Sequence, residues 1–159
     1  MSQSEQSEYG RLEALTFSGN KDIWSPPPEV LCLSLPYIMR FLRSFYDARH
    51  TLSLDLHGMG LKRLPPECLE LAWTLKALYI NHNDLETLPI CIEELSGLQT
   101  LHIHHNRITK LPPVVGLCLT ELTDLDLSYN QMTRLPLEFG NLKKLSRYSE
   151  VPSPEPPGR

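Results

Sequence analysis

The chain has 159 residues, of which 41% are hydrophobic, and its formal net charge is −4. This length and apolar content suffice for one core of ordinary domain size. The acidic balance offers no basic surface to nucleic acid, so DNA and RNA are not expected as partners. Residues 1–8 are polar and acidic, and we expect neither a secretory signal nor a membrane span.

The first expected elements are a polar segment at residues 1–11, predicted to be disordered, and a degenerate repeat at 12–33. The degenerate repeat is recognised mainly from its end, because PPEVLCL at 27–33 aligns with PPECLEL at 65–71. We expect its strand, 15–17, to pair in parallel with the strand at 53–57.

An amphipathic helix is predicted over residues 34–50. Ser34 and Pro36 are typical of a helix start. Apolar residues then recur at the spacing of one helical face: Ile38, Phe41, Leu42 and Phe45. The other face carries Arg40 and Arg43, and two arginines on a short helix favour packing within the protein over contact with a membrane surface.

Residues 51–145 repeat one pattern four times, in units that begin at Thr51, Leu75, Leu98 and Leu122. Positions 3 to 7 of each unit, as in ALYIN and TLHIH, alternate outward and inward, which predicts a short strand with its Leu or Ile side chains in the core. A single unit cannot bury these side chains. Stacked units can pair their strands in parallel and share one core.

Asparagine recurs at position 9 of three units, where each strand must turn away: Asn83, Asn106 and Asn130. A side-chain amide both donates and accepts hydrogen bonds, so we expect a structural ladder of asparagines across neighbouring turns. In the first unit Met59 takes this position, and the flanking Gly58 and Gly60 predict a turn made by permissive backbone. Leu-Pro steps at 88–89, 111–112 and 135–136 then favour extended return segments.

These units resemble the leucine-rich repeat family, whose pattern is L-x-x-L-x-L-x-x-N-x-L-x-x-L-P. The resemblance implies an α/β solenoid: a horseshoe segment with a concave parallel β-sheet and an irregular or 3-10 convex side. Because Leu33 ends one unit and Thr51 starts another, we expect the helix 34–50 to be an insertion on the convex side. The short units and the Leu-Pro step resemble the intracellular class found in Ras-suppressor, Scribble-like and ROCO-type proteins. That class implies a cytoplasmic protein.

Four cysteines are present, and we expect all of them to be reduced thiols. Cys68 and Cys118 take apolar core positions of their units, and no C-x-x-C pair suggests a metal site. Residues 146–159 form a proline-rich segment that we expect to be a disordered tail.

The outward positions 5, 7 and 8 of the units are the candidate contact surface for another protein. Histidine and tyrosine are abundant there, and both make good contact residues. The predicted partner-binding residues are Asp55, His57, Tyr79, Asn81, His82, His102, His104, His105, Asp126, Ser128 and Tyr129.

A metal site is the alternative interpretation of these histidines. His102 and His104 share one face of a strand, and Asp126 is expected about 5 Å away on the next strand. Because structural zinc usually recruits cysteine, we favour a plain contact surface and expect no metal and no cofactor. A pH-sensitive surface is a further alternative, in which nearby aspartates favour protonated histidine near pH 6 to 7.

Motifs for nucleotide binding, zinc hydrolysis or nucleophilic catalysis are absent from the sequence. We therefore expect a non-catalytic interaction module, not an enzyme. The family resemblance implies a scaffold or adaptor in intracellular signalling, with small GTPases or phosphatases as possible partners. The alternative is the repeat region of a larger signalling enzyme, ROCO-type or a phosphatase or GTPase regulator, present here as a truncated or spliced product.

Overall fold

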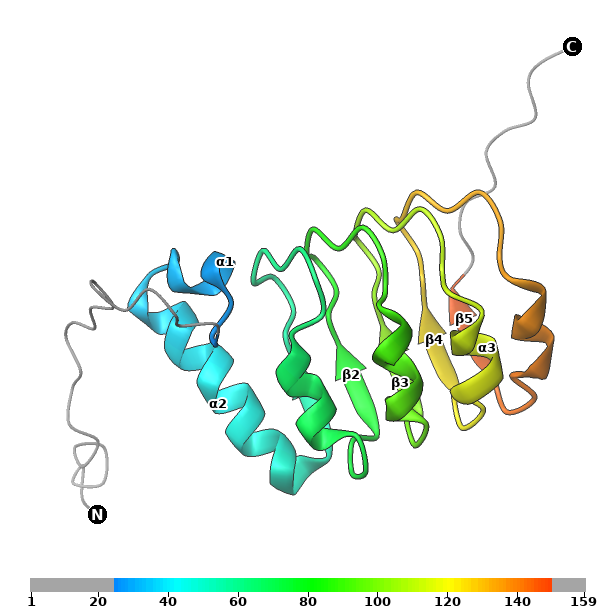
Figure 1. Ribbon diagram of the computed structural model, residues 1–159, viewed down its shortest axis with the longest axis horizontal. Helices are drawn as coiled ribbons and strands as arrows, with labels where there is room; N and C mark the ends of the chain where they lie inside the picture. The colour runs from blue at the N-terminus through cyan, green and yellow to red at the C-terminus, as the bar shows by residue number, and fades with distance from the viewer. Residues whose placement is uncertain (1–24, 150–159) are drawn as a thin grey trace, which may run out of the picture.

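A parallel sheet runs along one side of the protein, and short helices stack on the other (Figure 1). The structure is a computed structural model that describes residues 25–149. Over these residues the sheet has the order β1-β2-β3-β4-β5. The strands are β1 (Ser53–Asp55), β2 (Ala77–Tyr79), β3 (Thr100–His102), β4 (Asp124–Asp126) and β5 (Arg147–Ser149). The predicted α/β solenoid with a parallel sheet is confirmed.

Each strand pairs with the next in the register of the repeat. Leu54 lies opposite Leu78, Leu78 opposite Leu101, and Leu101 opposite Leu125. These leucines point inward and are at most 1% exposed. Because the same position of every unit meets its counterpart, the inward side chains merge into one continuous core, as stacking of repeats requires.

Short helices follow the Leu-Pro steps on the side opposite the sheet. The 3-10 helices are η1 (Pro66–Leu71), η2 (Ile90–Leu95) and η3 (Leu137–Asn141), and the unit that begins at Leu98 has instead the α-helix α3 (Val114–Cys118). Proline stands just before or within the first turn of each of these helices, where its missing N–H costs nothing.

The α-helical turn corrects one predicted core position. In η2 the buried residues Ile92 and Leu95 are three apart, as a 3-10 helix requires. In α3 the spacing lengthens to four, so Val115 and Leu119 are fully buried and Cys118 is only half-buried. The prediction that Cys118 is a core residue is therefore wrong, and Leu119 takes its place.

The asparagine ladder ties neighbouring units together. Asn106 donates from Nδ2 to the carbonyl oxygens of Ile80 and Ile103, at 3.0 and 2.9 Å, and its Oδ1 accepts from the N–H of Leu85 at 3.0 Å. Asn83 and Asn130 make the corresponding bonds one unit before and one unit after. A buried backbone that bends at each unit thus keeps its hydrogen-bonding groups paired.

The first unit makes its turn without its own asparagine. Gly58 and Gly60 adopt φ angles of 63° and 67°, which the absence of a side chain permits. Met59 fills the asparagine's place in the core and is 1% exposed. Its N–H donates to Oδ1 of Asn83 at 3.0 Å, so the ladder of the next unit still anchors this turn.

Two helices cover the N-terminal end of the stack. The short α1 (Pro28–Leu31) packs against α2 (Leu35–Thr51), and α2 lies next to β1 and η1 (Figure 1). The guanidinium of Arg40 donates to the carbonyl oxygen of His57 in the turn that follows β1. We expected this helix on the convex side; instead it crosses the end of the stack, because its apolar face covers the core of the first unit.

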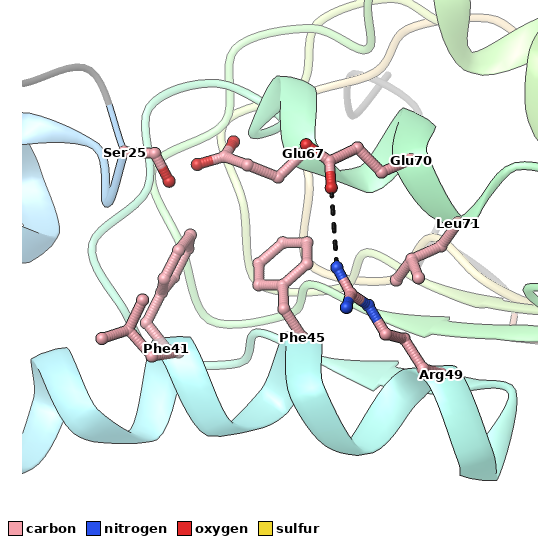
Figure 2. Close-up of a pocket in the computed structure, with 8 residues that line it drawn as sticks. Ser25, Phe41, Phe45, Arg49, Glu67, Glu70 and Leu71 are labelled. Carbon is pink, nitrogen blue, oxygen red and sulfur yellow. Dashed lines mark ion pairs between the residues drawn. The ribbon is translucent and has the colours of Figure 1, made fainter.

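A small cavity remains beneath α2, as Figure 2 shows. Phe41 and Phe45 of α2 face Glu67 and Leu71 of η1 across a space of about 270 Å³. Both carboxylate oxygens of Glu67 are buried and have no hydrogen-bond partner among the described residues. The contact between α2 and η1 therefore leaves a carboxylate buried without a hydrogen bond.

Several predictions concern residues outside the described range or at its edge. The segment 1–11, the pairing of 15–17 with 53–57 and the tail beyond Ser149 lie outside the described residues. Residues 147–149, which we expected within a disordered tail, form β5 instead, because their backbone continues the ladder of β4. Within residues 25–149 no helix combines the length and the apolar content needed to cross a bilayer.

Candidate functional site

The outward side chains of the sheet, with those of the turns that follow the strands, form one surface, called here the sheet face. Strand alternation turns Leu78, Leu101 and Leu125 inward, so that Tyr79 and His102 lie outward. All eleven predicted contact residues are exposed or half-buried on this side; these are Asp55, His57, Tyr79, Asn81, His82, His102, His104, His105, Asp126, Ser128 and Tyr129.

Position 8 of every unit has a left-handed backbone. The φ angles are 63° at Gly58, 54° at His82, 52° at His105 and 52° at Tyr129. A positive φ is uncommon for residues with a side chain and persists only where the surroundings enforce it. Here the N–H groups of His82 and His105 donate to carbonyl oxygens of the next unit, at 3.0 and 3.1 Å. The sequence analysis did not predict the left-handed backbone at position 8. The glycine at this position of the first unit, Gly58, was the residue that could have indicated it.

The left-handed turns place three rings in a row across the stack. The ring centroids of His82 and His105 are 4.2 Å apart, and those of His105 and Tyr129 are also 4.2 Å apart, with the rings stacked in both pairs. A second, edge-on contact joins Tyr79 and His102, whose centroids are 5.1 Å apart. The sheet face therefore carries aromatic and imidazole rings that support one another.

Carboxylates hold several of the polar groups in place. Asp55 Oδ1 lies 2.7 Å from Nδ1 of His57 at the exposed N-terminal end of the surface. His102 Nε2 is buried without a hydrogen bond among the described residues, and it lies 3.3 Å from Oδ1 of Asp124, a half-buried residue that we had not included among the candidates. Asp124 occupies position 3, which also points outward, so the alternation of the strand was the signal that could have found it.

Burial shifts the protonation of His104. Burial lowers the pKa of this imidazole, Asp126 raises it, and the neighbouring histidines lower it further, so that the net pKa lies below the ordinary value. The expectation that nearby aspartates favour protonated histidine is therefore wrong for His104, since burial outweighs the carboxylate. For Asp126 itself, burial acts to raise the pKa, but hydrogen bonds from Ser128 outweigh that effect and lower it.

Three histidines converge at the turns of two neighbouring units. One ring nitrogen from each of His82, His104 and His105 lies within 4.8 Å of those of the other two. Nδ1 of His104 is 2.9 Å from Nδ1 of His105. The set considered from the sequence, His102 with His104 and Asp126, shares only His104 with this group. We call His82, His104 and His105 the histidine cluster.

Comparison with known proteins agrees with the observed architecture. Residues 96–147 match the family model described as leucine rich repeat. A solved leucine-rich repeat protein of Leptospira interrogans is similar over 69% of this chain and 33% of its own, with 29% identity and a TM-score of 0.58. A chain of the Drosophila Toll–Spatzle complex is similar over 60% of this chain and 13% of its own, with 29% identity and a TM-score of 0.53.

This chain thus spans a third or less of the length of either solved relative. A search of curated proteins finds no match. The family model and the solved relatives support the leucine-rich repeat family that was identified from the sequence pattern.

Proposed function

We propose that this leucine-rich repeat solenoid is a protein–protein interaction module that holds its partner on the sheet face. The observation that carries the proposal is the set of rings that contact one another on the sheet face, namely the edge-on pair of Tyr79 and His102 and the stacked row of His82, His105 and Tyr129. The family match and the solved relatives support a binding role. One of the similar chains comes from a protein–protein complex, that of Toll and Spatzle.

The rings are suited to contact because they are large and already ordered. Tyrosine and histidine bring a wide contact area with two rotatable side-chain bonds, and interfaces are usually dominated by a few such residues. Stacking and the left-handed turns restrain these rings before any partner arrives. Less side-chain entropy is then lost on binding than for free lysine or glutamate side chains.

We further propose that the module serves as a scaffold or adaptor in intracellular signalling, in the cytoplasm. The Leu-Pro steps resemble those of the short intracellular repeats in Ras-suppressor, Scribble-like and ROCO-type proteins, and small GTPases or phosphatases are the corresponding partner classes.

The test is a double change, Tyr79→Ala with His102→Ala, in the tagged 159-residue chain. Proteins captured from a cell lysate would be quantified by mass spectrometry against the unchanged chain. We expect the specific partners to be lost from the double variant. Thermal unfolding should stay close to that of the unchanged chain, because both side chains lie outside the core.

The matched control changes two side chains away from the sheet face, Trp73→Ala with Leu137→Ala. These residues are 95% and 94% exposed. Their replacement should leave capture intact. Capture that survives the sheet-face change and is lost in this control would place the contact surface on the convex side and overturn the proposal.

A further inference from the structure

The histidine cluster joins two neighbouring repeats at the edge of the sheet face. His82 comes from the unit that begins at Leu75, and His104 and His105 come from the next unit. Their rings contact one another in all three pairs, with centroid distances of 5.2, 4.2 and 5.2 Å. The fold thus brings His82 next to two imidazoles that lie 22 and 23 residues further along the chain.

The separations fit a single metal ion after small side-chain movements. A tetrahedral zinc ion with Zn–N bonds of about 2.0–2.1 Å holds its ligand nitrogens about 3.4 Å apart. The cluster has nitrogens within 4.8 Å of one another, and its closest pair is at 2.9 Å. The ring of His82 lies nearly parallel to that of His105, at an interplanar angle of 18°, so this exposed ring must rotate out of the stack to direct a nitrogen at the same ion.

The contact between His104 and His105 already brings two candidate ligand nitrogens together. Two Nδ1 atoms at 2.9 Å share one proton, since a neutral imidazole donates at one nitrogen and accepts at the other. A metal ion can take the place of that proton if the donating ring moves its own proton from Nδ1 to Nε2, which is the other neutral tautomer. Both rings then bind through Nδ1 without any change in their total number of protons.

The backbone under the cluster is held firmly. His82 and His105 both have the left-handed conformation, with φ of 54° and 52°. Each is followed directly by an asparagine of the ladder, Asn83 or Asn106, which is 7% exposed and bonded to two units. Ligands presented from such turns lose little freedom when a metal binds.

We propose that His82, His104 and His105 bind one divalent zinc-class ion, with the remaining coordination position open to the solvent. Three neutral imidazoles suit zinc, copper and nickel, whereas magnesium and calcium prefer oxygen ligands. Structural zinc sites are closed by four protein ligands, whereas three protein ligands leave one position for water. The site shares His82 and His105 with the proposed partner contact, but zinc binding can be measured without the partner because all three ligands come from this chain.

The probe is zinc chloride, added to the untagged 159-residue chain and followed by isothermal titration calorimetry in a non-chelating buffer. The background carries Cys32→Ser, because that exposed thiol could compete for zinc. We expect one zinc ion per chain and no heat with magnesium. His104→Ala should weaken zinc binding at least about 100-fold, since loss of a ligand exceeds the 10–100-fold effect of its supporting groups.

His82→Asn provides a second variant that removes a ligand. Asparagine tolerates the left-handed backbone at this position, so the turn should be kept while the ring is lost. Its zinc affinity should fall as it does for His104→Ala, and circular dichroism should show the fold of both variants unchanged.

His57→Ala is the matched control, because His57 lies on the same face but outside the cluster. Its zinc affinity should equal that of the background chain. An equal loss in His57→Ala and His104→Ala would show diffuse binding to surface histidines and overturn the proposal. Unchanged affinity in His104→Ala, or no zinc binding by the background chain, would overturn it as well.

Discussion

Leu64 and Leu135 occupy the same position of the first and last repeats, yet Leu64 is 7% exposed and Leu135 is 42% exposed. At the N-terminal end, α1 and α2 cover the core of the first unit (Figure 1). At the C-terminal end of the described residues, Met132 and Phe139 are only half-buried against the core. The difference shows that a repeat buries its apolar side chains only as far as the next element covers them.

Units between these ends are covered on both sides. Leu88 and Leu111, at the same position, are 2% and 5% exposed. In a stack of this kind, stability is approximately a sum of unit terms and contacts between neighbours. The covered units should therefore carry most of the free energy of unfolding, and the following predictions test that distribution.

The largest effect is expected for Leu111→Ala, compared with Leu135→Ala. Removing a leucine that is 5% exposed should lower the free energy of unfolding by about 2–5 kcal/mol. The same change at the 42% exposed Leu135 should cost about 1 kcal/mol, because less apolar surface is lost from the core. Urea denaturation followed by circular dichroism measures both. Equal losses would show that the last unit is covered in solution.

Asn106→Ala and Asn130→Ala compare the ladder inside the stack with its uncovered end. Asn106 is 7% exposed, so its removal leaves buried backbone groups without partners and should cost about 1–3 kcal/mol. Asn130 makes the corresponding bonds but is half-buried, and water can replace part of its amide. We expect a smaller loss there in the same denaturation experiment. Asn81→Ala, on the outward side of a strand, is the control and should change little.

Arg40→Ala tests the closure of the covered end. Loss of the bond from Arg40 to the carbonyl oxygen of His57 should lower the free energy of unfolding by about 1 kcal/mol, since the pair is partly exposed. Arg43→Ala on the same helix is the control, because Arg43 is exposed. Hydrogen exchange should increase in β1 for Arg40→Ala alone. A uniform increase across all five strands would contradict a local role.

Cys32 and Cys68 should differ in how fast their thiols react with an alkylating reagent. This test needs no substitution, so the free energy of unfolding stays the same. Burial raises the pKa of the Cys68 thiol far above its ordinary value, and the carboxylate of Glu67 raises it further. Cys68 therefore stays protonated and unreactive in the folded chain, whereas the exposed Cys32 reacts. Mass spectrometry after brief alkylation at pH 8 should find Cys32 modified and Cys68 free. Rapid modification of both thiols would mean that α1 and α2 do not cover the first unit.

The sequence by itself determined the elements whose cause is local. Alternation in ALYIN and TLHIH placed the leucines of the strands inward and the candidate contact residues outward. The asparagine spacing identified the ladder, because each amide recurs at the same turn of its unit. These features depend on periods of two residues and of one repeat, which can be read directly from the chain.

Only the tertiary structure decided how the units end and which side chains meet. The change from a 3-10 turn to α3 moved Leu119 into the place expected for Cys118, because helix type depends on packing against the neighbouring units. The helix 34–50 was expected on the convex side, and its place at the end of the stack follows from which core remained uncovered. The histidine cluster replaced the set of His102, His104 and Asp126 for a related reason. The alternation of a strand determines only the face of the sheet on which a side chain lies. The direction of His82 and His105 is set instead by left-handed turns, which hydrogen bonds to the next unit enforce.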